Sequence, residues 1–234
     1  MRSLFNKFIF YQLATLLIFP VNRFLVDVER FEEDEHEPMS AKGMGALYTY
    51  DTNGKRFRED ITGDAREALL NKYYRPHHRQ LGLLAEQAID SFGQALIVDA
   101  HSFPDIPLPC DTNQDFPRPD ICLGTDFFHT PVWIIELAKV QFEKQGYSVE
   151  INSPYSGTMV PLDFYKTDSR VSSIMIEINR RLYLDGEYRT IQPNFEKLNT
   201  CINQLFALVT EQCKLHNKNL NKLIVLQLVC RFLS

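Results

Sequence analysis

Residues 93–103 read Gly-Gln-Ala-Leu-Ile-Val-Asp-Ala-His-Ser-Phe, and this stretch decides the fold. Gly93 closes an amphipathic helical pattern, because glycine readily takes the backbone conformation that ends a helix. The apolar run from Ala95 to Ala100 is short and continuous, which is typical of a buried strand in a largely parallel sheet. A helix that leads directly into such a strand predicts an α/β fold.

Helical and strand patterns alternate outward from this run along the chain. Apolar residues recur at helical spacing from Asp64 to Phe92, and Pro76 is expected to kink or restart that helix. Further elements are predicted as strands at 120–124, 147–152 and 172–179 and as helices at 131–145 and 194–214. The sequence therefore predicts a mixed, mostly parallel sheet flanked by helices, with functional groups at the carboxyl ends of its strands.

The amino-terminal part of the chain is apolar and then acidic. Its pattern predicts a helix at 3–11 and a strand at Ala14–Phe19, followed by a turn and a second strand within the first 30 residues. The apolar stretch at 8–20 lacks a small-residue cleavage motif and is too short to cross a bilayer, so neither a secretory signal nor a membrane span is expected. The acidic stretch at 31–38 is expected to be a solvated loop.

Composition indicates a globular protein in a reducing compartment. The 234 residues are 44% apolar and 24% charged, which fits a single domain over residues 1–234. The five cysteines are odd in number and contain no Cys-x-x-Cys pair, so a cytoplasmic location is expected. The net charge of −5 argues against nucleic-acid binding. The apolar tail at 215–234 matches no pattern, and an added helix and an aberrant reading-frame end are both open.

Two polar residues stand out at predicted strands. His101 follows a buried strand, and Asp99 is placed to fix the tautomer of a metal-binding imidazole; a structural histidine is the alternative. Glu177 interrupts the apolar strand at 172–179. In a central strand its carboxylate would be desolvated and suited to act as a general base, whereas on a solvent-facing side it would be an ordinary surface charge.

Two loops carry residues that could contact a small ligand. Segment 152–157, Asn-Ser-Pro-Tyr-Ser-Gly, follows a predicted strand and can present Tyr155 together with backbone N–H groups. Segment 118–126 begins at Arg118 and has charged residues on both sides of a strand; ordinary turn chemistry is the alternative for both loops. The sequence contains no His-Glu-x-x-His, Gly-x-Ser-x-Gly or Walker motif, which excludes the commonest motif-defined hydrolases and NTPases.

Seven segments in the same order together resemble the N-formylglutamate amidohydrolase (N-formylglutamate deformylase) family. They fall between about residues 14 and 185 and comprise residues 21–31, 43–45, 73–78, 99–103, 118–125, 152–157 and 173–180. Each segment alone is a weak match, but seven in register make a specific one. The resemblance implies a zinc hydrolase with a core similar to that of zinc carboxypeptidases, the phosphorylase/hydrolase-like fold.

The resemblance also implies a reaction and the residues that carry it. The reaction is hydrolysis of N-formyl-L-glutamate to formate and L-glutamate, the last step of one route of histidine degradation. His101 matches a zinc ligand of the family, and Glu177 matches its general base. The substrate has two carboxylates, which suit the planar, bidentate side chain of arginine. The candidate substrate-binding residues are Arg23, Arg118, Arg180, Asn152 and Tyr155.

The sequence departs from the family pattern at the metal site. The family's Pro-His-Ser-Gly loop and the acidic ligand after it are absent, and no histidine precedes His36. We therefore expect an amino-terminally truncated member with impaired zinc chemistry, since a catalytic zinc normally has three protein ligands. His36 with Glu32 or Glu35 could replace the missing ligands. Two other functions are open: a metal-free remnant that binds acidic amino-acid derivatives, and a hydrolase of another N-acyl acidic amino acid.

Overall fold

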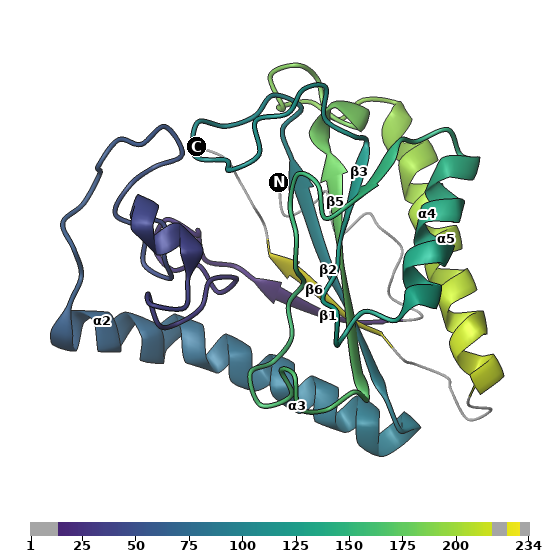
Figure 1. The fold of residues 1–234 in the computed structure, drawn as a ribbon, viewed down its shortest axis with the longest axis horizontal. Coiled ribbons are helices and arrows are strands. Elements are labelled where there is room, and N and C mark those ends of the chain that lie inside the picture. The colour runs from purple at the N-terminus through teal and green to yellow at the C-terminus, as the bar shows by residue number, and fades with distance from the viewer. Residues whose placement is uncertain (1–13, 217–223, 230–234) are drawn as a thin grey trace.

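A computed structural model describes the backbone of residues 14–216 and 224–229, so the helix predicted at 3–11 lies outside the described residues. Its centre is a six-stranded sheet in the order β1–β6–β2–β5–β3–β4 (Figure 1). The strands are β1 (Ala14–Phe19), β2 (Ala95–Phe103), β3 (Ile121–Gly124), β4 (Val149–Ile151), β5 (Val171–Asn179) and β6 (Ile224–Val229). Neighbouring strands are parallel except β3 and β5, which confirms the predicted mixed, mostly parallel sheet.

Helices cover both faces of the sheet. They are α2 (Gly63–Leu69), α3 (Arg75–Phe92), α4 (Val132–Lys144) and α5 (Asn194–His216), with a π-helical turn at Leu70–Tyr74 and 3-10 turns at Pro38–Lys42 and Arg180–Leu182. Helices α4 and α5 pack together on one face, and α3 runs along the other (Figure 1). None of the helices in the described ranges is long and apolar enough to cross a membrane.

Alternate residues of β2 pack on opposite faces of the sheet, because successive side chains of a strand point to opposite sides. Leu96 and Val98 pack into the cluster under α4 and α5, whereas Ile97 packs into the cluster under α3. Each such buried aliphatic side chain stabilises the fold by roughly 2 kcal/mol. The same alternation assigns Asp99 and His101 to the α3 face, at the carboxyl end of β2.

The helical region predicted at 64–92 is two helices joined by the π-helical turn. Proline has no backbone N–H group to donate, and its ring clashes with the carbonyl group one turn earlier in a helix. The first turn of a helix tolerates proline, because its N–H groups have no partner within the helix. Pro76 lies in the first turn of α3, and the backbone N–H of Arg75 donates to the carbonyl of Leu70. The predicted restart of the helix at Pro76 is confirmed.

The acidic stretch at 31–38 is mostly exposed, as expected of a solvated loop. Glu37 is the exception, because its side chain is buried. Its carboxylate accepts hydrogen bonds from the backbone N–H groups of Phe31 at 3.1 Å and Met39 at 2.9 Å. The buried charge therefore caps the 3-10 turn that begins at Pro38.

One expectation about secondary structure is wrong, and one alternative that the sequence left open does not hold for residues 224–229. Residues 21–28 form turns instead of a strand, because Asn22 accepts local bonds from Phe24 N through its side chain and from Leu25 N through its backbone, each at 2.9 Å. In the apolar tail, the described residues 224–229 form the strand β6 instead of an added helix, and β6 pairs in parallel with both β1 and β2. Strand β6 therefore lies in the interior of the sheet.

Gly124 lies at the end of β3, against the loop that carries Tyr155. A Cβ atom at position 124 would overlap the carbonyl oxygen of Gly157 and the side chain of Met175. We expect Gly124→Ala to lower the free energy of unfolding by about 2 kcal/mol in urea denaturation, since the methyl group must displace backbone. Gly186→Ala is the matched control, because a Cβ there meets none of the described atoms within 4 Å. Equal stability losses in the two variants would contradict this packing.

Candidate metal and substrate site

The carboxyl ends of β2 and β5 bring His101 and Glu177 side by side. The two strands are parallel, and their register pairs these two residues, so both side chains point to the same face of the sheet. Cys122 of β3 is paired with Glu177 on its other side. Because β5 is an interior strand and Glu177 is 0% exposed, the carboxylate is desolvated, which was the condition for a general base at this position.

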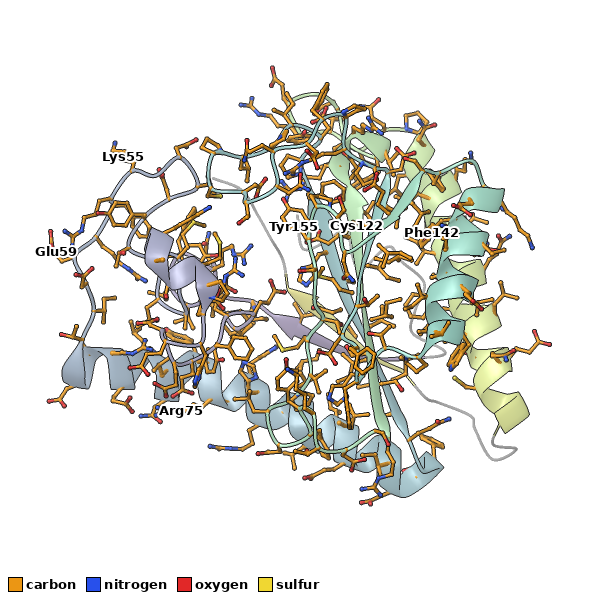
Figure 2. All side chains as sticks on the ribbon, in the orientation of Figure 1. Lys55, Glu59, Arg75, Cys122, Phe142 and Tyr155 are labelled. Atoms are coloured by element: carbon orange, nitrogen blue, oxygen red, sulfur yellow. The ribbon has the colours of Figure 1, made fainter. Side chains whose placement is uncertain are left out.

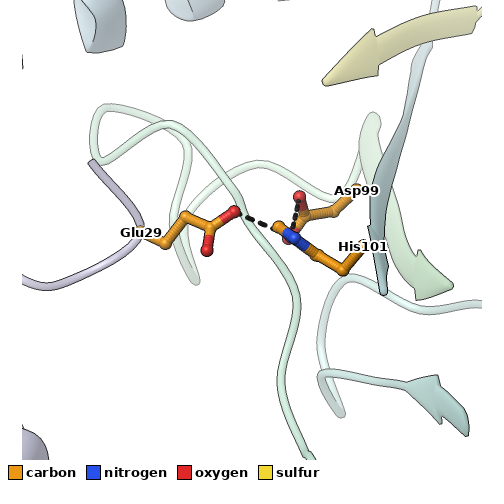
Figure 3. Close-up of side chains that lie close together, drawn as sticks. All are labelled: Glu29, Asp99 and His101. Carbon is orange, nitrogen blue, oxygen red and sulfur yellow. Dashed lines mark hydrogen bonds and ion pairs between the residues drawn. The ribbon is translucent and has the colours of Figure 1, made fainter. Parts of the chain in front are cut away.

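Two carboxylates and one imidazole meet at His101 (Figure 3). Nε2 of His101 lies 2.6 Å from Oδ1 of Asp99 and 2.8 Å from Oε1 of Glu29. His101 is 2% exposed and Asp99 is 4% exposed. The three donor atoms lie within 4.8 Å of one another, and no other trio of His, Cys, Asp or Glu in the part of the chain that the structure describes meets this condition.

The chemistry of this donor set fits a zinc ion. Imidazole nitrogen and carboxylate oxygen are both zinc ligands, and catalytic zinc sites commonly have three protein ligands. Around a tetrahedral zinc with bonds of about 2.1 Å, the ligand atoms lie roughly 3.4 Å apart. The carboxylate oxygens of Glu29 and Asp99 lie 2.8 and 2.6 Å from Nε2 of His101, so they would move apart by less than about 1 Å to reach the spacing of zinc ligands.

The cluster does not contain the replacement ligands suggested by the sequence. His36 is exposed, and Glu32 lies 2.5 Å from Arg75 in an ion pair. Glu29 supplies the second carboxylate instead, and the sequence reasoning missed it because Glu29 and His101 are far apart in the chain. The available signal was its place in the matched segment at 21–31, directly before Arg30.

Asp27 fixes the loop that carries Glu29. Its fully buried carboxylate lies 2.5 Å from Nη2 of Arg23 and 3.5 Å from Nε of Arg30, and it accepts a hydrogen bond from the Tyr48 hydroxyl at 2.7 Å. Its other oxygen accepts the backbone N–H of Glu29 at 3.0 Å. Burial raises the pKa of Asp27, but Arg23 and Arg30 outweigh it and hold the pKa below the ordinary 3.8. Asp27 is therefore ionised at neutral pH.

A cavity of about 920 Å³ opens in front of the cluster. Its size lies in the range of small-molecule binding sites. Five of the residues selected from the sequence line it: His101, Arg23, Arg180, Asn152 and Tyr155. Glu29, Asp99 and Arg30 line it as well, so the wall carries both the acidic cluster and several cations.

Arg118 lies behind the wall of this cavity and supports Tyr155. The arginine is 3% exposed, with Nη2 2.7 Å from Oδ2 of Asp111 and Nη1 donating to the Tyr155 hydroxyl at 3.0 Å. Tyr155 and Cys122 lie close together at one end of the sheet (Figure 2), where the Cys122 thiol donates to the Tyr155 carbonyl at 3.1 Å. Tyr155 is thus held at both its hydroxyl and its backbone.

Arg180 reaches the cavity from the 3-10 turn after β5, and Asn152 from the loop after β4. The buried Arg180 donates from Nη2 to the carbonyl of Ser102 at 2.9 Å and from Nε to its hydroxyl at 3.2 Å. Asn152 is exposed, has φ of 57°, and binds the backbone N–H and the hydroxyl of Thr125 at 2.8 Å each. Arg180 is therefore an oriented cation, whereas Asn152 shapes the loop that leads to Tyr155.

Comparison with known proteins points to one family. The sequence model described as N-formylglutamate amidohydrolase matches residues 2–184. An N-formylglutamate deformylase of Pseudomonas putida is 27% identical over 181 residues, which cover 74% of this chain and 65% of that protein. An N-formylglutamate deformylase of Pseudomonas aeruginosa is 26% identical over 181 residues, covering 74% of this chain and 66% of that protein. The chain thus spans slightly less than two thirds of the length of these relatives.

A solved structure has a similar fold. The crystal structure of N-formylglutamate amidohydrolase from Ralstonia eutropha JMP134 matches with a TM-score of 0.72 at 23% sequence identity. The match covers 83% of this chain and 75% of that chain. At this level of identity the likeness concerns the fold, and it agrees with the α/β class predicted from the sequence.

Replacing Asp27 by asparagine tests whether the buried charge fixes the loop of Glu29. The amide keeps the size of the side chain but cannot form ion pairs with Arg23 and Arg30. We expect Asp27→Asn to lower the free energy of unfolding by about 3 kcal/mol at neutral pH, because the partly buried Arg23 and Arg30 lose the fully buried carboxylate that both contact. The exposed Glu86→Gln is the control and should change it by less than about 0.5 kcal/mol in the same urea titration. No loss in Asp27→Asn would contradict the role of this charge.

Proposed function

The chain belongs to the N-formylglutamate amidohydrolase family, and we propose on this premise that it hydrolyses N-formyl-L-glutamate to formate and L-glutamate. The observation that carries the proposal is the cluster of Glu29, Asp99 and His101, which faces a cavity of small-molecule size beside the buried Glu177. The names of the two Pseudomonas relatives support the choice of substrate. The reaction would end one route of histidine degradation.

The proposed metal is zinc, with Glu29, Asp99 and His101 as its ligands. The donor set and the family resemblance both support this choice. When bound, zinc lowers the pKa of a water molecule to near 7 and polarises the carbonyl group of the substrate. The two carboxylates leave the cluster negatively charged, so it attracts a divalent cation.

Glu177 is the proposed general base. In this scheme water adds its oxygen to the formyl carbon, Glu177 accepts the proton, and the carboxyl group passes it to the nitrogen as the C–N bond breaks. The parallel register supports this role, because it holds Glu177 beside His101 without any loop movement. Backbone pairing on both sides, with β2 and β3, fixes the backbone position of Glu177 in the sheet.

The two carboxylates of the substrate require cations, and the wall of the cavity carries them. Arg180 and Arg23 are the proposed carboxylate-binding residues, since guanidinium groups can donate two parallel hydrogen bonds to one carboxylate. Tyr155 is proposed to contact the substrate directly, and Arg118 to act through Tyr155. Asn152 completes the proposed set from the exposed edge of the cavity.

A cytoplasmic location is part of the proposal. Four of the cysteines are described, and all four are free thiols: Cys110, Cys122, Cys201 and Cys213. Free thiols persist in reducing compartments, where disulfide bonds are rare.

Calorimetric titration of the metal-free chain with zinc tests the metal site. We expect one zinc ion per chain, and binding at least about tenfold weaker in His101→Gln and Glu29→Gln, because each variant removes a ligand. His36→Gln replaces an exposed histidine and is the matched control. Absence of zinc binding by the unaltered chain would refute the site and favour the expected impaired member. Unchanged binding in His101→Gln would place the zinc elsewhere.

Formate release from N-formyl-L-glutamate by the zinc-loaded chain tests the reaction. We expect Glu177→Gln to lower kcat by at least about 100-fold with unchanged zinc affinity, because an amide cannot accept the proton. The exposed Glu150→Gln on β4 is the matched control and should leave kcat unchanged. A higher kcat/KM for N-acetyl- or N-succinyl-L-glutamate than for N-formyl-L-glutamate would identify another N-acyl acidic amino acid as the substrate. Binding of glutamate derivatives without turnover would identify a binding remnant.

A further inference from the structure

Glu29 lies on a segment without regular secondary structure, so contacts with other elements must fix its position. Two hydrogen bonds hold the carbonyl groups of the two residues that flank it. The Tyr74 hydroxyl donates to the carbonyl of Arg30 at 2.7 Å, and Nε2 of His78 donates to the carbonyl of Val28 at 2.9 Å. The residue that brings the second carboxylate to the cluster is therefore held from both neighbouring carbonyls.

Both donors come from one short stretch of helix. Tyr74 ends the π-helical turn, and His78 lies four residues later in the first turn of α3, so the two side chains are neighbours on the same helix face. Their ring centroids are 4.3 Å apart with an angle of 31° between the ring planes. π-Helical turns within α-helices are frequent at functional sites. The two side chains therefore contact the segment that carries Glu29 together, from one helix face.

Both groups stay in the donating form at neutral pH. A carbonyl can only accept, so Nε2 of His78 carries the proton, while Nδ1 has no hydrogen-bond partner among the described residues. Burial lowers the pKa of His78, despite the opposing hydrogen bond to Val28, and so favours the neutral ring. Burial raises the pKa of the Tyr74 hydroxyl, which therefore remains protonated.

A third contact reaches the same segment but is weaker. Arg75 forms an ion pair with Glu32, and the two side chains are 33% and 19% exposed. Partly exposed ion pairs contribute little to stability, because water screens the charges. Tyr74 is 2% exposed and donates its hydrogen bond at the wall of the cavity, and losing a hydrogen-bond partner costs more at a buried position than at an exposed one. The hydrogen bonds of the tyrosine and the histidine therefore restrain the segment more firmly than this ion pair does, and they act together with the bond from Glu29 N–H to Asp27.

We propose that Tyr74 and His78 are positioning residues that hold the metal ligand Glu29 at its place beside His101. The proposal rests on the proposed metal site. Oε1 of Glu29 lies 2.8 Å from Nε2 of His101, and either carbonyl, once released, would let the backbone of Glu29 move away from the cluster. Partners that orient a metal ligand affect metal affinity without touching the metal.

Zinc affinity of conservative variants tests the proposal. Tyr74→Phe removes only the hydroxyl, His78→Leu removes the donor, and His78→Gln restores an N–H group at a similar reach. We expect zinc binding to weaken about tenfold in Tyr74→Phe and His78→Leu, and His78→Gln to recover most of the loss. Tyr73→Phe is the matched control, since that ring contacts Lys72. Unchanged zinc affinity in folded Tyr74→Phe, with Tm as the check on folding, would overturn the proposal.

Hydrogen exchange of the metal-free chain separates this proposal from the proposed function. The backbone N–H of Glu29 donates to Asp27, so its exchange rate reports how firmly the segment is held. We expect protection of this amide to fall about fivefold in Tyr74→Phe and to stay unchanged in Tyr73→Phe. Unchanged protection in Tyr74→Phe would overturn the positioning role even if the unaltered chain binds zinc. Lowered protection without zinc binding would uphold the restraint and refute the metal site.

Discussion

The in-register pairing of β2 with β5 is the constraint on which the candidate site depends. It places His101 beside Glu177 and, by strand alternation, puts Asp99 on the same face. A register slip of one residue in this pairing would turn the polar groups toward α4 and α5. It would also turn aliphatic side chains away from the apolar cluster in which they pack. Because Leu96 and Val98 pack under α4 and α5, the apolar core fixes the register, and the register fixes the site.

The site concentrates buried charge, and the arrangement of ions explains how the fold tolerates it. Asp27 has two arginine partners, whereas Asp99 and Glu29 share the imidazole of His101, and the other oxygen of Glu29 lies 3.5 Å from Nη2 of Arg23. Burying carboxylates is costly unless positive charge lies close to them. In the proposed metal site a divalent cation would add positive charge between Asp99 and Glu29.

The charge around the cavity also reconciles an acidic protein with the acidic substrate that we propose. The chain has a net charge of −5, yet Arg23, Arg30 and Arg180 line the same cavity as the acidic cluster. Charges within a few ångströms dominate binding in a partly desolvated pocket, while the net charge of the surface is screened by salt. The local placement of the arginines therefore matters more than the overall composition.

Local patterns predicted the strands and helices that form the sheet layers, because burial on a sheet or helix face leaves a regular spacing of apolar residues. The same reasoning failed at 21–28, where Val26 and Val28 are buried beneath turns and only resemble a strand. It also left 224–229 open, since a short apolar run becomes a strand only when free strand edges, here those of β1 and β2, are available.

The sequence by itself determined the α/β architecture and the candidates His101 and Glu177, because both lie on strands whose direction and spacing follow from local pattern. Only the tertiary structure decided that Glu29 joins them and that Arg118 stands behind Tyr155 instead of facing the cavity. Those outcomes depend on contacts between segments far apart in the chain, formed when loops are held by helix α3 and by buried ion pairs. The local spacing of residues in the sequence does not indicate such contacts.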